Sequence, residues 1–211
     1  ILLDVGEKSE VEKKEVWQEK VTTSNAKRSL ISYLKSRGVA KIDQLVLTDR
    51  EPKQLDHVLE ISKTFVIGEI LVTEETLSQR DFFDKLKENN LNVRPLKTGD
   101  NLFVFGSHLE VITTQNKDKK DSIAMYGKLL HQTFLVTGDI EENSLTSYDP
   151  KLQADVLITH QSSSKNKSDV EVFKNLQPKM TVMSVDKKKR FKVKNGKINQ
   201  EDKEVENAIY K

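Results

Sequence analysis

The sequence predicts a mixed α/β fold with two sheets and outer helices, and three observations lead to this prediction. Short runs of β-branched and apolar residues recur along the chain and indicate strands. Segments with helical periodicity alternate with these runs up to about residue 90 and again after residue 137. Between them, four consecutive strand runs fill residues 102–137. Such a meander favours a second sheet over one continuous parallel sheet.

The first half of the chain is expected to begin with a strand over Ile1–Gly6. A helix follows over Ser24–Arg37, where Leu30 and Leu34 share one face, Ser24 can cap the start and Gly38 the end. The next expected elements are, in order, a strand over Ile42–Thr48, a helix over Leu55–Lys63, a strand over Val66–Val72 and a helix over Ser78–Asn89.

The second half is expected to contain most of the strands. The meander comprises Leu102–Phe105, Leu109–Thr114, Ile123–Leu130 and Thr133–Thr137, and later strands are Val156–Thr159 and Met180–Val185. Helices are expected over Ser168–Leu176 and Glu201–Tyr210. The polar stretches are read as loops and cover Glu7–Asn25, Gln115–Asp121 and Asp186–Gly196.

Composition excludes several classes of site. Because 35 basic side chains face 33 acidic ones, no global field selects a nucleic acid or a membrane, and any binding surface must be local. The lack of cysteine excludes disulfides, thiolate zinc sites and a cysteine nucleophile. No run approaches the roughly 20 apolar residues of a membrane helix. The length of 211 residues predicts a single domain, 1–211. Because the chain opens on a strand already under way, we expect this domain to be cut from a larger protein.

Common catalytic motifs do not occur in the sequence. There is no Gly-rich phosphate loop, no dinucleotide fingerprint, no Gly-x-Ser-x-Gly turn and no His-Glu-x-x-His segment. The four histidines are scattered, and an isolated histidine is more often a core or solvated residue than a ligand. Generic motifs therefore assign no chemistry.

Three segments in a fixed order are more informative: Leu2–Gly6, Tyr33–Thr48 and Leu135–Asp139, in which acidic residues follow apolar strand runs. Together with Pro178–Val185 and Arg190 they resemble the C-terminal metallo-β-lactamase-fold domain of the ComEC/Rec2 family of DNA-uptake competence proteins. The resemblance covers nearly the whole chain. It implies a four-layer αββα sandwich, truncated at its N-terminal strands, with a metal site at one edge of the two sheets.

The same resemblance locates a vestigial site. In active members a strand ending in Thr, as at Thr48, leads into a His-rich segment that supplies most metal ligands. This chain has Asp49, Glu51, Lys53 and Gln54 at those positions. An ammonium group repels a cation and offers no lone pair, and an amide oxygen is a weak ligand. The complete vestigial set comprises Asp4, Asp49, Glu51, Lys53, Gln54, Asp139 and His160.

Two further family segments are also altered. Where the family has His-His-Gly-Ser-Lys, either His160 or Gln161 of this chain stands at the first histidine, depending on the register. After Arg190, the family's His-Pro-His is replaced by Phe191–Asn195. We therefore expect no bound cofactor and a Lys53 ammonium close to Asp4 or Asp139. The alternative is an oxygen-ligand site for a divalent metal such as manganese, magnesium or zinc.

Basic residues gather near the C-terminus, where seven of the eleven positions 187–197 are Lys or Arg. Such a run fits a solvated loop. The resemblance, however, places it at the rim of the former site, where several cations could contact phosphates and Phe191 could stack on a base. The candidate DNA-binding residues are Lys165, Lys187, Lys188, Lys189, Arg190 and Lys192.

The resulting functional expectation is the extracellular domain of a competence channel protein in the cell membrane. We expect a catalytically silent domain that binds or guides single- or double-stranded DNA without sequence specificity. Its other expected partners are the membrane-channel remainder of the same polypeptide and other competence proteins. Two alternatives stay open: an active metal-dependent nuclease with an oxygen-ligand site, and a protein-interaction module that does not contact DNA.

Overall fold

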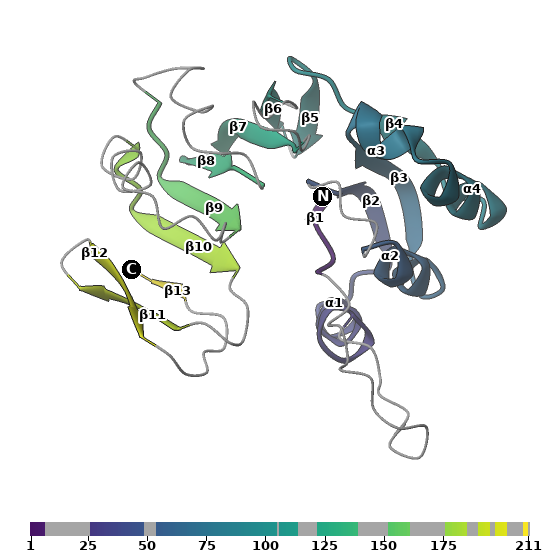
Figure 1. Ribbon diagram of the computed structural model, residues 1–211, viewed down its shortest axis with the longest axis horizontal. Coiled ribbons are helices and arrows are strands. Elements are labelled where there is room, and N and C mark those ends of the chain that lie inside the picture. The colour runs from purple at the N-terminus through teal and green to yellow at the C-terminus, as the bar shows by residue number, and fades with distance from the viewer. Residues whose placement is uncertain are drawn as a thin grey trace. The chain divides into compact units, whose positions relative to one another are not determined.

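The computed structural model has a mixed α/β fold with two main sheets, as the sequence predicts (Figure 1). It forms two compact units, an N-terminal unit, Ile1–Leu96, and a C-terminal unit, Lys97–Lys211. The single domain over residues 1–211 stays a prediction. The structure describes residues 1–6, 26–48, 54–104, 106–113, 122–138, 152–160, 176–184, 190–194, 197–201 and 209–210.

The N-terminal unit is built on a four-stranded sheet with the order β1-β2-β3-β4, in which all neighbours run parallel. Its strands are β1 (Leu2–Leu3), β2 (Lys41–Val46), β3 (Val66–Val72) and β4 (Val93–Pro95). Its helices are the π-helical η2 (Ala26–Ile31), α1 (Ser32–Ser36), α2 (Leu55–Ser62), α3 (Glu74–Ser78) and α4 (Arg80–Glu88). The expected end of the first helix is confirmed, because Gly38, at φ 70°, donates its N–H to the Lys35 carbonyl oxygen over 3.0 Å.

The core of this unit lies between the sheet and its helices. Ile70 and Val72 of β3 belong to the same buried cluster as Val58 of α2 and Leu86 of α4. Leu71, on the opposite face of β3, is fully buried as well. The predicted strand Val66–Val72 coincides with β3, and its second half, Ile70–Val72, is buried on both faces and is a continuous apolar run, as is typical of parallel strands.

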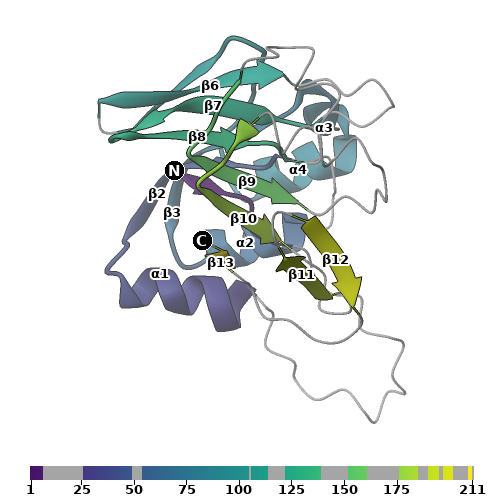
Figure 2. The same ribbon diagram turned by 90° about the vertical axis from the view of Figure 1, so that its left-hand side faces the viewer.

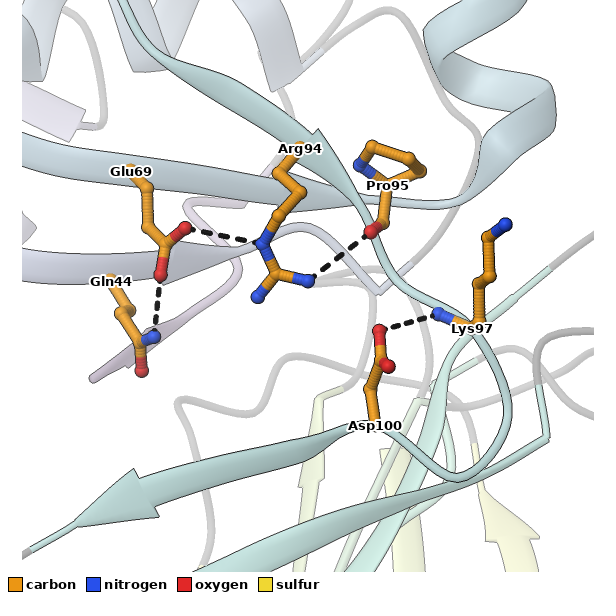
Figure 3. Close-up of polar contacts among 6 residues, drawn as sticks. All are labelled: Gln44, Glu69, Arg94, Pro95, Lys97 and Asp100. Atoms are coloured by element: carbon orange, nitrogen blue, oxygen red, sulfur yellow. Dashed lines mark hydrogen bonds and ion pairs between the residues drawn. The ribbon is translucent and has the colours of Figure 1, made fainter.

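A row of polar side chains crosses the same sheet. Gln44 Nε2 donates to Glu69 Oε1 over 2.7 Å, and Arg94 Nε lies 3.4 Å from Glu69 Oε2 (Figure 3). Beyond β4, the Lys97 main-chain N–H donates to Asp100 Oδ2 over 2.9 Å in the turn before the next strand (Figure 3). These half-exposed polar contacts add little stability. They are possible because the strand pairing places Gln44 of β2 opposite Glu69 of β3 and brings Arg94 of β4 near it.

The C-terminal unit contains a seven-stranded sheet with the order β13-β10-β9-β8-β7-β6-β5 (Figure 2). Its strands are β5 (Asn101–Val104), β6 (Ser107–Thr113), β7 (Ala124–Leu129), β8 (Gln132–Val136), β9 (Val156–His160), β10 (Met180–Ser184) and β13 (Ile209–Tyr210). The expected meander is confirmed, because β5 to β8 pair antiparallel in sequence order. Strands β8, β9 and β10 pair in parallel. A separate ribbon consists of β11 (Arg190–Lys194) and β12 (Lys197–Glu201).

Both faces of the larger sheet also carry buried side chains. Leu135 and Leu157 belong to a cluster with Leu152 and Leu176, which come from segments outside the strands. Met125, which β7 directs to the opposite face from Ala124 of that cluster, is fully buried. No helix in the described ranges is long and apolar enough to cross a membrane.

Two predictions for the C-terminal region are wrong. The expected loop Asp186–Gly196 contains β11, which pairs antiparallel with β12. Apolar residues alternate along this strand as Phe191 and Val193, and the Asn195-Gly196 dipeptide that follows is a strong sequence signal for a hairpin turn. The basic residues between them obscured this pattern.

The helix expected over Glu201–Tyr210 is wrong at both of its ends, while residues 202–208 lie outside the described residues. Glu201 is the last residue of β12, and Ile209–Tyr210 form β13, which pairs antiparallel with Val182 and Thr181 of β10. A β-branched and an aromatic residue favour the sheet, and the main-chain bonds of this pair extend it by one strand. The helix expected over Ser168–Leu176 lies outside the described residues except for Leu176.

Asp155 joins the starts of three parallel strands. Its Oδ2 accepts from the Thr133 N–H over 2.8 Å and from Thr133 Oγ1 over 2.9 Å, and its Oδ1 lies 2.7 Å from Lys179 Nζ. The bond to Lys179 and then those from Thr133 hold the pKa of Asp155 well below its usual range. This carboxylate therefore connects residues of β8 with the residue before β10.

This arrangement predicts a pH-dependent stability. A carboxyl group whose pKa is lower in the folded state stabilises the fold above its unfolded pKa of about 3.9, and the contribution is lost as pH falls through the folded value. We expect Asp155→Asn to lower the melting temperature at pH 7, with a difference from wild type that shrinks as the pH is taken below about 4.

Asp43 provides the matched control. It forms an exposed ion pair of the same length, 2.7 Å, with Lys41, and that lysine lowers its pKa. Among the described residues, no threonine donates to Asp43 as Thr133 donates to Asp155. Asp43→Asn should leave the melting temperature almost unchanged at either pH, since exposed pairs contribute little. If the difference in melting temperature between wild type and Asp155→Asn stayed constant over the whole pH range, the ionisation of Asp155 would not contribute to stability.

Candidate functional site

The described site residues lie at the carboxyl ends of parallel strands in each unit. In the N-terminal unit, Asp4 follows β1 and Thr48 follows β2. In the C-terminal unit, Gly138 follows β8, while His160 ends β9 and pairs with Ser184 at the end of β10. Carboxyl ends of parallel strands share one edge of their sheet, which is where α/β proteins place ligands. The sequence order thus brings polar groups to one edge of each sheet.

Asp4 is held firmly at the edge of the N-terminal sheet. Its N–H donates to the Val46 carbonyl oxygen over 2.8 Å, which continues the pairing of β1 with β2. Its Oδ1 accepts from the Thr48 N–H over 2.8 Å, and its Oδ2 accepts from Thr48 Oγ1 over 2.6 Å. Asp4 also has φ 54°, a left-handed conformation that Asp and Asn adopt more readily than most residues. Both carboxylate oxygens therefore join the ends of two strands.

His57 of α2 contacts the turn after β1. Its Nδ1 lies 2.9 Å from the Gly6 carbonyl oxygen and 3.3 Å from that of Val5. Carbonyl oxygens only accept, so Nδ1 carries a hydrogen and donates it. The residue is only 2% exposed, and Nε2 has no hydrogen-bond partner within the part of the chain that the structure describes. Sequence reasoning missed this residue, because nothing distinguishes an isolated histidine in α2 from an ordinary core residue.

The edge of the C-terminal sheet is ordered by threonines. The Thr137 N–H donates to the Ile158 carbonyl oxygen over 3.0 Å, and Thr137 Oγ1 donates to Thr159 Oγ1 over 2.9 Å. Gly138 follows with φ 52°, a conformation that favours glycine. These contacts hold the end of β8 on β9, directly before Asp139 in the sequence.

The structure describes only part of the predicted site. Asp4 and Gln54 are described completely, and Gln54 is buried at the start of α2. His160 is described in its main chain at the end of β9, and so are Arg190 and Lys192 in β11. The other predicted residues lie outside the described residues: Asp49, Glu51, Lys53, Asp139, Lys165, Lys187, Lys188 and Lys189. The expected ion pair of Lys53 thus stays a prediction.

The donor groups fit a metal ion poorly. Asp4 directs both carboxylate oxygens to Thr48, and Gln54 offers an amide in place of an imidazole. Within the described ranges, no three or more His, Cys, Asp or Glu side chains come together as a metal site. Asp49, Glu51 and Asp139 lie outside the described ranges, so the absence of a bound metal stays a prediction.

Comparison with known proteins relates the chain to one curated protein. It is 23% identical over 197 residues to ComE operon protein 3 of Bacillus subtilis (strain 168). The match covers 88% of this chain and 25% of the relative, so the chain spans about a quarter of that protein's length. No protein-family model matches the chain.

Two solved structures share the fold. The metallo-β-lactamase fold protein YhfI from Bacillus subtilis superposes with a TM-score of 0.54 and 12% identity, covering 77% of this chain and 71% of that chain. A diphosphatase from the PhnP family superposes with a TM-score of 0.52 and 15% identity, covering 73% and 63% of the two chains. At such identities the likeness concerns the fold alone. The chain therefore has the metallo-β-lactamase fold and is similar in sequence to ComE operon protein 3, as the resemblance implied.

Proposed function

We propose that the chain is a catalytically silent, metal-free domain that binds or guides DNA in a competence protein. The observation that carries the proposal is the match to ComE operon protein 3 over 88% of the chain, in a sequence whose metal-ligand positions have lost their histidines. In this proposal the domain lies on the extracellular face of the cell membrane. The channel-forming remainder of the same polypeptide and other competence proteins are its partners.

The basic ribbon, defined as β11 and β12 with residues 187–189 before it, supports DNA binding. Main-chain pairing places Lys194 opposite Lys197 and Lys192 opposite Asn199. Positions 187–197 carry seven Lys or Arg residues and no acidic one, whereas Glu201 at the end of β12 stands opposite Arg190 in the main-chain pairing. Two-stranded ribbons are an established element for contacting nucleic acid, and cations on them neutralise phosphates. This charge distribution favours DNA binding that does not depend on the base sequence.

The altered donor set supports the lack of catalysis. Hydrolysis by a bound metal requires ligands that fix the ion and leave a position open for water. Lys53 stands at a family ligand position, and its ammonium cannot coordinate. Asp4, a second member of the set, binds Thr48 through both oxygens. The remaining carboxylates, Asp49, Glu51 and Asp139, are the basis of the alternative nuclease.

The test of DNA binding is a salt titration with the 211-residue chain and a labelled single-stranded oligonucleotide. Each neutralised phosphate contributes a slope of about −0.7 in log K against log salt. Replacing Lys187, Lys188, Lys189 and Arg190 together by Ser should reduce the magnitude of the slope by up to about 3 and weaken binding at low salt at least tenfold. If this variant binds the oligonucleotide with unchanged affinity, the basic ribbon is not the DNA-binding site.

A matched control changes the net charge equally at another surface. The exposed lysines of the N-terminal unit serve this purpose, and the control variant carries Ser at Lys35, Lys63, Lys85 and Lys87. It should retain nearly the wild-type slope, since its cations belong to the N-terminal unit and the basic ribbon belongs to the C-terminal unit. An equal loss in both variants would show that total charge, rather than the ribbon, governs binding.

Metal analysis of the purified chain separates the alternatives. We expect no stoichiometric metal, no cleavage of DNA with added manganese, and the same melting temperature with and without chelator. Stoichiometric metal together with cleavage would replace the silent domain by the working nuclease. If the chain contains no metal and shows no salt-sensitive DNA binding, the protein-interaction module is selected.

A further inference from the structure

Two neighbouring hairpins of the C-terminal unit expose large apolar side chains. Phe103, in the β5–β6 hairpin, is 76% exposed, and Leu130, in the β7–β8 hairpin, is 82% exposed. Because β6 pairs with β7 and places His108 opposite Lys128, both hairpins end at the same edge of the sheet (Figure 2). We define the hairpin-tip patch as Phe103, His108, Lys128, Leu130 and His131, all of them exposed.

The stability of the turn does not explain why a leucine occupies position 130. The connection between β7 and β8 consists of Leu130 and His131, flanked by the pair Leu129 and Gln132. Leu130 has φ 58°, at a hairpin position where glycine or asparagine is the usual residue. A leucine here combines an unfavourable backbone conformation with an apolar side chain in water. Such a residue suggests a contact outside the chain.

The charges around these side chains have one sign. Residues 101–109 and 122–138, which contain the part of the β5–β6 hairpin near its turn and the whole β7–β8 hairpin, include no Asp or Glu. The strand pairing sets Phe103, His108 and Lys128 side by side on one face, with the rings of Phe103 and His108 6.3 Å apart. Glu110 lies two residues further along β6, opposite Tyr126 and away from the tips. The patch is therefore apolar at its tips and cationic or neutral around them.

We propose that the hairpin-tip patch binds an anionic lipid surface. Phe103 and Leu130 enter the boundary between headgroups and acyl chains, while Lys128 remains among the headgroups. An apolar anchor with a nearby cation is the combination that peripheral membrane contacts require. Single-stranded DNA suits Phe103 but leaves Leu130 unexplained, because leucine has no aromatic face for a base to stack on. The inference does not depend on DNA binding, which is assigned to the basic ribbon.

Sedimentation of the 211-residue chain with lipid vesicles tests the proposal. We expect binding to vesicles of phosphatidylcholine and phosphatidylglycerol that decreases as salt rises, and weaker binding to phosphatidylcholine alone. The double variant Phe103→Ser with Leu130→Asn should bind at least tenfold more weakly, since two buried apolar side chains are lost. Lys128→Ser should lose about fivefold on the anionic vesicles only.

Matched variants keep the result interpretable. Asn readily adopts positive φ, so Leu130→Asn alone should fold at least as well as wild type and still bind more weakly. Tyr33→Ser with Val66→Ser removes two side chains of the N-terminal unit that are 56% and 67% exposed, and it should bind like wild type. If wild type fails to sediment with either vesicle, or if the double variant sediments equally well, the proposal is wrong. Loss of single-stranded DNA binding in Phe103→Ser without any lipid binding would likewise overturn it and assign the patch to nucleic acid.

Discussion

Gly127→Ala should destabilise the protein by about 2 kcal/mol or more, the cost of forcing extra volume into a filled space. Gly127 lies in β7, opposite Leu109 of β6. A Cβ atom at this position would collide with the His108 carbonyl oxygen and would lie 2.9 Å from Leu109 Cα. These are main-chain atoms of a paired strand, so they cannot rotate away as a side chain could. Equilibrium unfolding in urea measures the loss.

A glycine in open space is the appropriate control. Gly38 has φ 70°, and a Cβ there would meet no atom within 4 Å. Gly38→Asn should therefore change the free energy of unfolding by only a few tenths of a kcal/mol, since Asn tolerates this backbone region. Equal stability of Gly127→Ala and wild type would show that β6 and β7 can separate without cost.

Asp4→Ala should lower the free energy of unfolding by about 3 kcal/mol. Removal of the carboxylate abolishes two hydrogen bonds from Thr48, each with an ionised acceptor and therefore stronger than a neutral one. Alanine is also strained at φ 54°, where Asp4 sits. Thermal or urea unfolding provides the measurement.

Asp4→Asn distinguishes a structural from a metal-binding carboxylate. Asn tolerates the same φ and can accept from the Thr48 N–H through its amide oxygen, so we expect a loss of about 1 kcal/mol only. In a double-mutant cycle with Thr48→Val, Asp4→Ala should show a coupling energy of about 1–2 kcal/mol. Additive losses in that cycle would mean that the two side chains do not act together.

The sequence predicts the strands of this fold well for a physical reason. The runs at residues 66–72 and 156–160 belong to parallel strands with buried residues, so β-branched and apolar side chains dominate them. The helix expected over Ser78–Asn89 corresponds to α4, Arg80–Glu88. The preceding helix α3, which Thr73 caps by accepting a bond from the Thr76 N–H, was not predicted. In β11 the apolar residues Phe191 and Val193 alternate as in a strand, but the basic residues around them are typical of a solvated loop.

The site was only partly predictable. Asp4 was placed at a strand end by its position after an apolar run, but its partner Thr48 is 44 residues away and became visible only in the structure. The contact of His57 with Gly6 spans 51 residues and has no sequence signature. Local patterns locate strand ends, whereas the partners of polar groups at those ends depend on how the chain brings distant segments together.

Strand β13 has a consequence for how the chain can be shortened. It pairs with Thr181 and Val182 of β10 and forms the outermost position of the seven-stranded sheet on that side. Deleting Ile209 and Tyr210 would leave the main-chain N–H and C=O groups of β10 available to a strand of another molecule. Unpaired edges of this kind promote intermolecular sheet formation. A chain that ends before residue 209 is therefore more prone to aggregate, although its core residues are unchanged.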